Sequence, residues 1–282
     1  MTRHNEVPAF GVPVLAYHAN NISSNEYTGN DHVALATDLR TLANHGWQSI
    51  PLDTLLDWHA GKVSDDAVRR RFVITFDDGS DFDFRDIDHP SCGRQRSFYN
   101  VLRDFEEAAG LPAYAASFVI ASPEARQVLD ERCLIGQGWW NDDWWPEASA
   151  SGRLAIECHG WDHLHPELDS VAQAEGRAGD FRAVDSLGDC RRQLLDAARY
   201  VERRAGRRPR YFAFPWGQYS RYLVERYLPG YQEEHGYRAA FTTQARAVSD
   251  RDDRWRFPRM VCGEAWCGSE ELLETVEGCQ SS

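Results

Sequence analysis

Segments rich in apolar and β-branched residues alternate with helical patterns along almost the whole chain, and this alternation constrains the fold more than any other feature. Strands joined by helices form a mostly parallel sheet. A barrel or distorted barrel fits the pattern better than a doubly wound open sheet. Strands are expected at 12–18, 47–52, 71–76, 115–120, 153–158, 210–214, 237–243 and 255–261, with helices at 31–46, 97–110, 187–201 and 269–278.

The length of 282 residues suits one α/β barrel, and a hydrophobic content of 42% is enough for a large core. With no internal repeat and no linker, we expect a single domain over residues 1–282, with its core at about 12–262. The net charge of −13 argues against a nucleic-acid partner or an anionic membrane face, because both need a cationic surface. No apolar run approaches the roughly 20 residues that span a bilayer. No Gly-rich phosphate loop follows a strand, so no nucleotide cofactor is expected.

Seven cysteines are present, an odd number without the spacing of a disulfide framework. They form no Cys-x-x-Cys pair, so a zinc site made of cysteines is not expected. The first residues, MTRHNEVPAFGVPV, lack the apolar core of a secretory signal peptide. Together these features predict a cytoplasmic protein with reduced thiols.

Two adjacent carboxylates, Asp77 and Asp78, follow the buried strand at 71–76 and precede Gly79. Neighbouring side chains on a strand point to opposite faces, but a glycine turn at the strand end lets both reach one cleft. Active sites of parallel α/β folds form at the carboxyl ends of the strands. The alternative interpretation is a surface turn with a helix-capping aspartate, which is the commoner fate of an isolated Asp-Asp-Gly.

Three histidines, His159, His163 and His165, follow the strand at 153–158 within seven residues. Two histidines four residues apart project from one side of a helical turn and can bind one ion. A lone histidine would more often be structural, but a cluster this dense is hard to explain by core packing. With a carboxylate, the imidazoles would leave coordination positions open for water or substrate.

These two motifs resemble those of the polysaccharide deacetylases of the NodB-homology type, carbohydrate esterase family 4. The segment 71–79 ends in Thr-Phe-Asp-Asp-Gly, and 159–168 carries His-x-x-x-His. The segments 12–18, 116–122 and 212–220 resemble further strands and motifs of that family in the same order. The resemblance implies a distorted (β/α) barrel of mostly parallel strands.

The resemblance also implies residue roles. Asp78, His159 and His163 would hold a divalent metal, usually zinc, and Asp77 would be the general base. The implied reaction is the metal-dependent hydrolysis of an N-acetyl group on an amino sugar or glycoconjugate. Metal-bound water has a pKa of about 7 in such sites, and the base takes its proton as it attacks the amide carbonyl.

The chain departs from the family pattern at several positions. Ala213 stands where the third motif carries an arginine that holds the base, and no histidine follows His235, so the usual late acid is missing. His18, at the end of the first strand, is the best remaining candidate for the acid and His165 is the second; a buried structural role for His18 stays open. Gly160 replaces the Ser or Thr that usually follows the first histidine of the motif.

Aromatic residues cluster near both motifs, with four tryptophans between positions 139 and 145. Aromatic faces stack on sugar rings, so a wall of the cleft is one interpretation of this segment, and a loop packed onto the barrel is the other. Asp162 is expected to orient a ligand histidine. The predicted substrate contacts are Trp140, Trp144, Trp161, Pro215 and Trp216.

Two other functions stay open at this point. One is a cytosolic amidase acting on a small or cyclic amide, because the same fold and related residues serve such enzymes. The other is a carbohydrate-binding pseudoenzyme, motivated by the missing arginine and late histidine. The expected partner is an acetylated amino sugar or a small amide, and the sequence does not indicate the oligomeric state.

Overall fold

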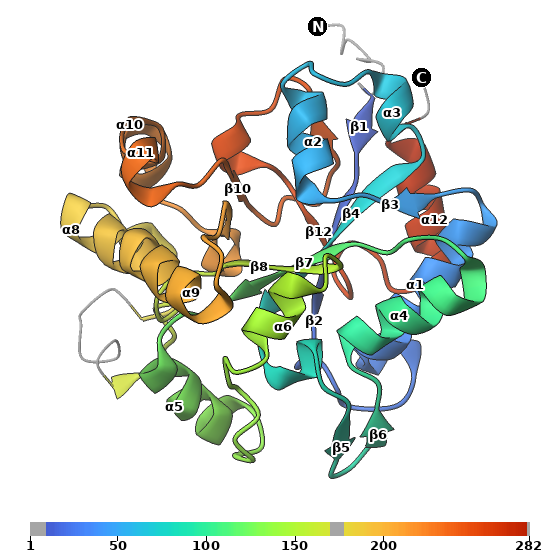
Figure 1. The fold of residues 1–282 in the computed structure, drawn as a ribbon, viewed down its shortest axis with the longest axis horizontal. Helices are drawn as coiled ribbons and strands as arrows, with labels where there is room; N and C mark the ends of the chain where they lie inside the picture. The colour runs from blue at the N-terminus through green and yellow to red at the C-terminus, as the bar shows by residue number, and fades with distance from the viewer. Residues whose placement is uncertain (1–9, 170–177, 281–282) are drawn as a thin grey trace, which may run out of the picture.

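One curled sheet of parallel strands forms the centre of the computed structural model, which describes residues 10–169 and 178–280 (Figure 1). Along the sheet the order is β10, β9, β8, β7, β4, β2, β12, and β3 pairs with β4. Every pairing within this sheet is parallel. The strands are β2 (Val14–His18), β3 (Gln48–Ser49), β4 (Arg71–Asp78), β7 (Ala115–Val119), β8 (Leu154–Cys158), β9 (Tyr211–Ala213), β10 (Ala239–Phe241) and β12 (Met260–Val261).

The two edges of the sheet are joined by the segment that leads into β12. Phe241 of β10 makes a parallel bridge with Phe257, and a few residues later Met260 and Val261 pair with β2. The sheet therefore curls into a barrel whose closing contact is short and irregular. This confirms the expected distorted (β/α) barrel. The last predicted strand, 255–261, is reduced to β12 because Arg254–Arg256 form a 3-10 turn.

Helices pack around the outside of the sheet (Figure 1). Among the described residues, no helix is long and apolar enough to cross a membrane. Two short antiparallel pairs are not hydrogen-bonded into this sheet, β1 (Gly11–Val12) with β11 (Val248–Ser249) and β5 (Ile87–His89) with β6 (Gly93–Gln95). The helices are α1 (Asp31–Asn44), α2 (Leu52–His59), α3 (Asp65–Val68), α4 (Phe98–Ala109), α5 (Pro123–Cys133), α6 (Trp145–Ala150), α8 (Leu187–Cys190), α9 (Ala197–Ala205), α10 (Leu228–Gly230), α11 (Gln232–His235) and α12 (Ser269–Gly278).

Capping residues explain where the helices start. The side chain of Asn30 accepts hydrogen bonds from the backbone N–H groups of His32 and Val33, so Asn30 caps α1. The predicted cap, Asp31, is instead the first residue of the helix. Helix α4 starts after the cap Ser97 and ends at Gly110, as its pattern predicts. The apolar stripe at 187–201 forms α8, a π-helical segment at Arg191–Asp196 and α9.

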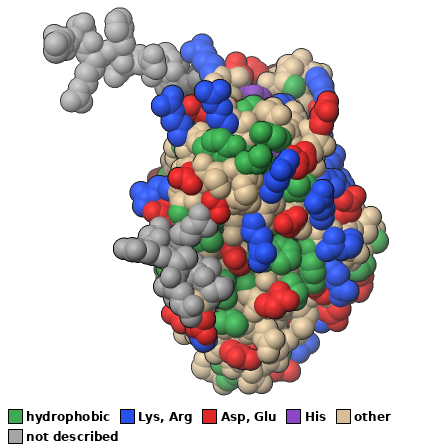
Figure 2. Space-filling model, turned by 90° about the vertical axis from the view of Figure 1, so that its left-hand side faces the viewer, with side chains coloured by type: hydrophobic (Ala, Val, Ile, Leu, Met, Phe, Trp, Pro, Cys, Tyr) green, Lys and Arg blue, Asp and Glu red, His purple; other side chains and the backbone are tan. Residues whose placement is uncertain are grey.

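Strand alternation divides the core into two parts. Val14, Val73 and Phe118 belong to the smaller apolar cluster, which also includes residues of β9 and β10. The intervening Leu15 and Ile74 belong to the larger cluster, where the sheet meets the helices. On the molecular face drawn in Figure 2, acidic and basic side chains are interspersed, as expected for a solvated surface.

A buried carboxylate ties the first helix to the barrel. Asp38 of α1 accepts hydrogen bonds from the hydroxyls of Tyr17 at 2.9 Å and Tyr27 at 2.7 Å, and from the indole N–H of Trp266 at 3.2 Å. Burial raises the pKa of Asp38 to about 6, although the three donors act to lower it. The folded protein therefore holds a proton on Asp38 more tightly than the unfolded chain, in which an aspartate has a pKa of about 4.

This shift predicts a pH-dependent effect of Asp38→Asn. The proton on Asp38 contributes stability that is fully present below about pH 4 and is lost as the pH rises through about 6. The amide of the variant does not titrate, so the wild type should lose stability relative to the variant across this window. Urea unfolding at several pH values measures the difference, and parallel pH profiles would contradict the assignment.

Candidate active site

The end of β4 brings two carboxylates to the mouth of the barrel. The side chain of Asp77 is buried. The next two residues, Asp78 and Gly79, have left-handed backbone conformations, with φ of +78° and +76°. A Cβ on Gly79 would lie 2.4 Å from Val119 Cγ1 and 2.9 Å from Val119 Cα, so only glycine fits here. The chain turns at the strand end and directs Asp77 and Asp78 toward the same cleft, as the sequence predicts.

His159 follows β8 directly, and its ring is held by one backbone acceptor. Its Nδ1 lies 2.9 Å from the carbonyl oxygen of Ala213, which can only accept, so Nδ1 carries the proton. The lone pair of His159 is therefore on Nε2, the atom that faces the two carboxylates. This hydrogen bond fixes both the tautomer and the orientation of a histidine that could bind a metal.

His163 lies in a strained loop after His159, with a backbone φ of +63°. Burial and the neighbouring His159 hold the pKa of His163 well below its usual range, so the ring is neutral, as a metal ligand must be. Asp162 does not orient a ligand histidine, contrary to the prediction. Its carboxylate accepts from the side-chain amide of Gln193 at 2.8 Å and from the N–H of Leu164 at 3.0 Å, and so it holds the loop itself.

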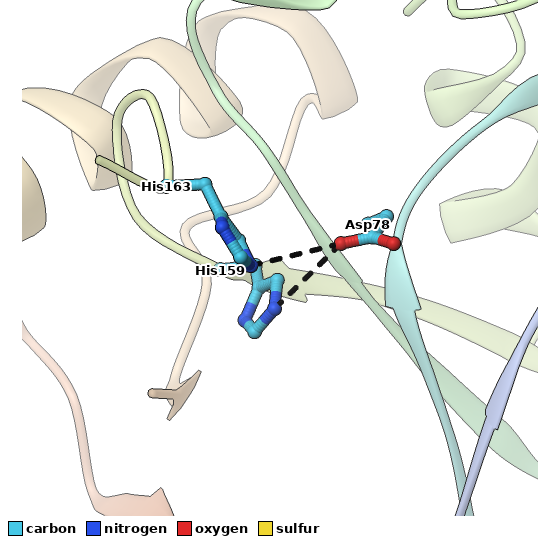
Figure 3. Close-up of side chains that lie close together, drawn as sticks. All are labelled: Asp78, His159 and His163. Carbon is cyan, nitrogen blue, oxygen red and sulfur yellow. Dashed lines mark ion pairs between the residues drawn. The ribbon is translucent and has the colours of Figure 1, made fainter. Parts of the chain in front are cut away.

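Asp78, His159 and His163 converge on one point, although they come from two distant parts of the chain (Figure 3). The Nε2 atoms of His159 and His163 lie 3.8 Å and 3.9 Å from Asp78 Oδ1, and one ligand atom from each residue lies within 4.8 Å of the others. These separations are too long for hydrogen bonds. They suit ligands that share one ion at about 2.0–2.2 Å each, so the residues fit a zinc-type site after a small contraction.

Arg259 forms a two-pronged ion pair with Asp77. Its two terminal nitrogens lie 2.6 Å and 2.7 Å from the two carboxylate oxygens, and the arginine is fully buried. The guanidinium also donates to the hydroxyl of Thr75 and the carbonyl of Thr242. Burial acts to raise the pKa of Asp77, but Arg259 and His159 outweigh it and hold the pKa below the ordinary aspartate value.

Arg259 corrects the expectation that the chain lacks an arginine beside Asp77, the predicted base. Ala213 does stand at the third-motif position, but the arginine comes from the segment preceding β12. It lies 182 residues from Asp77 in the sequence, and nothing in the local pattern FPRMV marks it as a site residue. The only available signal was an arginine in an otherwise apolar strand-like segment, where a buried charge requires a partner.

His18, at the end of β2, is paired in register with Asp77 and lines the same cleft. Its backbone N–H donates to Asp31 at 2.8 Å, and its ring Nδ1 is buried without a hydrogen-bond partner. His165, the second candidate acid, also lines the cleft, with Nε2 4.0 Å from the sulfur of Cys133.

The cleft has a volume of about 410 Å³ and has Trp140 and Trp216 in its walls. Trp140 donates from its indole nitrogen to the backbone carbonyl of Asp78, and Trp216 is 40% exposed and packs edge-on against His163. Three other predicted substrate contacts do not line it. Trp144 is 1% exposed and stacks on Phe84, Trp161 packs against Tyr200 and Arg192, and Pro215 is buried.

The burial of the Asp77–Arg259 pair predicts that Arg259→Met destabilises the fold by about 3–5 kcal/mol, because it leaves a carboxylate buried without its cation. The double variant Arg259→Met/Asp77→Leu should recover part of this loss. Arg221→Met, which removes an exposed arginine paired with Glu225, is the matched control and should have little effect. Chemical unfolding measures all three, and equal stabilities of the Arg259 and Arg221 variants would contradict the role of the buried pair.

The model of the polysaccharide deacetylase family matches residues 64–240, which include both the carboxylate and the histidine motifs. The chain therefore belongs to the polysaccharide deacetylase family. This confirms the expected enzyme class, a hydrolase that removes acetyl groups from amides. No curated protein sequence is a significant match.

Solved deacetylase structures share the fold at low sequence identity. The deacetylase PplD of Streptococcus pyogenes, solved with acetate, is 17% identical with a TM-score of 0.63, covering 95% of this chain and 99% of that one. IcaB of Ammonifex degensii is 22% identical with a TM-score of 0.61, covering 96% and 98%. A de-N-acetylase of Aggregatibacter actinomycetemcomitans is 16% identical with a TM-score of 0.59, covering 95% and 99%.

Proposed function

We propose that this deacetylase uses zinc to hydrolyse the N-acetyl group of an amino sugar within a glycan. The single observation that carries the proposal is the convergence of Asp78, His159 and His163 beside an ionised Asp77. We assign the first three residues as metal ligands and Asp77 as the general base. A bound zinc ion would lower the pKa of a coordinated water and polarise the amide carbonyl.

Arg259 keeps Asp77 in the form that accepts a proton. Its bidentate contact holds the carboxylate ionised and fixes its direction, while each oxygen keeps a second lone pair. Asp77 Oδ2 lies 3.8 Å from His159 Nε2, one of the proposed ligand atoms. A water held at the metal site would therefore lie close to the Asp77 carboxylate. Asp77 therefore takes the proton of the attacking water.

His18 is the residue we assign to protonate the leaving amine. It faces the cleft from β2, next to Asp77, and its Nδ1 has no partner among the described residues. Two aromatic walls, Trp140 and Trp216, suit the faces of a sugar ring. Acetate, the other product of such a reaction, is bound in the structure of the streptococcal deacetylase.

Arg259 also bears on the rival function of a carbohydrate-binding pseudoenzyme. That rival rests partly on a missing arginine, and the segment preceding β12 supplies one, Arg259. We also propose a cytoplasmic location, supported by the seven free cysteines, of which Cys133 and Cys267 are exposed.

Metal binding should depend on the ligand histidines. His159→Ala is expected to abolish stoichiometric zinc binding, since it leaves one imidazole and one carboxylate. His45→Ala, at an exposed histidine on the C-terminal side of α1, is the matched control. Elemental analysis after dialysis gives the zinc content of each protein, and undiminished zinc in the His159 variant would refute the ligand set.

Turnover should depend on Asp77 without a loss of metal. Asp77→Asn is expected to keep its zinc but to slow acetate release from N-acetylglucosamine oligosaccharides by about 100-fold or more, as for the loss of a base. Because the change also unpairs Arg259, folding is verified by thermal unfolding. Asp88→Asn, at an exposed carboxylate of β5, is the control.

Two outcomes would overturn this assignment. Full activity of the Asp77→Asn variant would exclude Asp77 as the general base. Opening of a cyclic amide, with no acetate released from any glycan, would favour the amidase function.

A further inference from the structure

The Trp-rich segment, residues 138–145, reaches the metal site from outside the set of ligands. Trp140 lines the cleft, whereas Trp144 is 1% exposed and Trp145 is fully buried in the core. The indole N–H of Trp140 donates at 3.2 Å to the backbone carbonyl of Asp78, one of the proposed ligands. The segment therefore contacts the backbone of a metal ligand as well as the cleft.

Asp78 depends on such contacts because its backbone lies in a region that residues other than glycine rarely adopt. Its φ of +78° is left-handed, and such a conformation persists where the surrounding structure fixes it. Two donors reach its carbonyl oxygen, the N–H of Ile120 at 3.1 Å and the indole of Trp140 at 3.2 Å. The first continues the pairing of β4 with β7, and the second comes from outside the sheet. Because the backbone angles set where the carboxylate points, the indole bond also bears on its direction toward His159 and His163.

The backbone of the Trp-rich segment is tied to the turn that follows Asp78. The N–H of Asp81 donates to the carbonyl of Trp139 at 2.9 Å. In return, the buried carboxylate of Asp81 accepts from the N–H of Asn141 at 2.7 Å and from its side-chain amide at 3.0 Å. The turn and the Trp-rich segment therefore form one hydrogen-bonded unit.

A buried arginine fixes this unit to the outside of the barrel. Arg126 of α5 is 2% exposed and donates to the backbone carbonyl of Trp140 at 3.1 Å and to the carboxylate of Asp142 at 2.6 Å. Its guanidinium also lies over the ring of Trp145, 4.9 Å from the centroid. Asp142 accepts in addition from the hydroxyl of Tyr200 at 2.6 Å. Trp140 therefore cannot shift without breaking a buried, charge-assisted contact.

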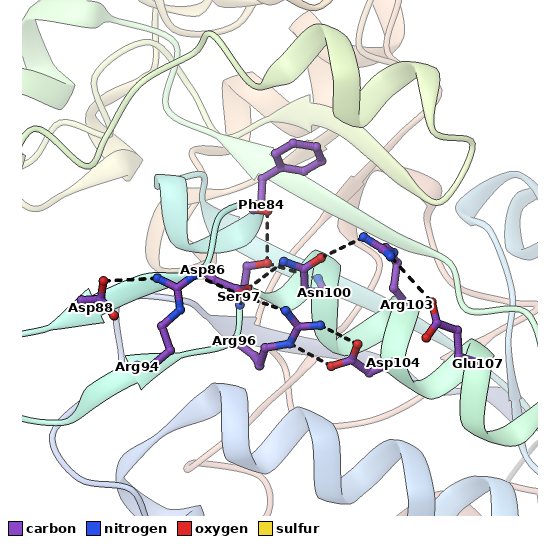
Figure 4. A network of polar contacts seen from close by, with 10 residues as sticks. All are labelled: Phe84, Asp86, Asp88, Arg94, Arg96, Ser97, Asn100, Arg103, Asp104 and Glu107. Carbon is purple, nitrogen blue, oxygen red and sulfur yellow. Dashed lines mark hydrogen bonds and ion pairs between the residues drawn. The ribbon is translucent and has the colours of Figure 1, made fainter.

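The chain that leaves the turn is anchored separately, at the start of α4. The hydroxyl of Ser97 donates to the carbonyl of Phe84 at 3.1 Å, and Asp86 accepts from the N–H of Ser97 and the amide of Asn100 (Figure 4). Trp144 stacks on the ring of Phe84 at 5.6 Å. These contacts hold the surroundings of the turn without the Trp140 indole, so removing its N–H changes mainly the support of the ligand itself.

We propose that Trp140 is a positioning residue of the metal site. Its indole N–H holds the backbone of Asp78 in the conformation that directs the carboxylate at the two ligand histidines, and Arg126 holds Trp140 in place. The inference rests on the proposed metal site and adds a residue that touches no metal. It gives the Trp-rich segment a role that is separate from any contact between its rings and a sugar.

The test is the zinc affinity of the full chain, measured against a competing zinc chelator. Trp140→Phe keeps an aromatic ring in the cleft wall but removes the N–H, and we expect zinc to bind at least about tenfold more weakly, as for other contacts just outside a ligand set. Trp139→Phe is the matched control. The Trp139 ring packs on Phe82, its indole N–H has no hydrogen-bond partner among the described residues, and zinc should bind as in the wild type.

A second variant tests the support of Trp140. Arg126→Lys keeps a positive charge for Asp142 but lacks the fork that also reaches the carbonyl of Trp140, so zinc affinity should fall again. Arg132→Lys, at an exposed arginine of α5 paired with Asp169, should leave it unchanged. Thermal unfolding of the metal-free proteins verifies folding, and the Arg126 variant decides the matter if the Trp140 variant fails to fold.

Three outcomes would contradict the proposal, and they differ from one another. Unchanged zinc affinity in the Trp140 and Arg126 variants would remove the positioning role while leaving the ligand set intact. Equal losses in Trp139→Phe and Trp140→Phe would show that any change in the segment acts, and not the indole bond. A wild type that binds no zinc would instead refute the ligand set, and this inference with it.

Discussion

The buried ion pair between Asp77 and Arg259 is the interaction on which the architecture of the site depends. A carboxylate buried this deeply would normally hold a proton, and a protonated aspartate cannot act as a base. The guanidinium offsets the burial with two short contacts and keeps Asp77 ionised. Arg259 precedes β12, so the same residue that sets the charge of Asp77 lies in the segment that closes the barrel.

The rest of the site follows from the ends of parallel strands. His18, Asp77 and His159 stand at the carboxyl ends of β2, β4 and β8, or directly after them, so a parallel barrel brings them to one rim. Local backbone geometry then orients each group. Gly79 permits the turn that swings Asp78 into the cleft, and the carbonyl of Ala213 sets the tautomer of His159.

The sequence predicted the short-range part of this arrangement. Asp77 with Asp78, and His159 with His163, lie within a few residues of each other at strand ends, so spacing and motif were enough to bring them together as candidates. Arg259 could not be predicted, because its partner is distant in the chain and only the closed barrel makes them neighbours. Trp144 was misassigned since an aromatic-rich loop has the same composition whether its rings face a cleft or, as here, the core. The last strand is shorter than predicted because Arg254–Arg256 form a 3-10 turn, and the alternation of arginines with Trp255 and Phe257 has the same pattern as a strand.

We propose above that Asp78, His159 and His163 share one metal ion beside Asp77. Crystals of the zinc-loaded protein, measured at the zinc absorption edge, test it most directly. One anomalous peak is expected, at about 2.0–2.2 Å from an oxygen of Asp78 and from Nε2 of both histidines. A peak at another place, or no peak with Asp78 turned away from the two imidazoles, would contradict it.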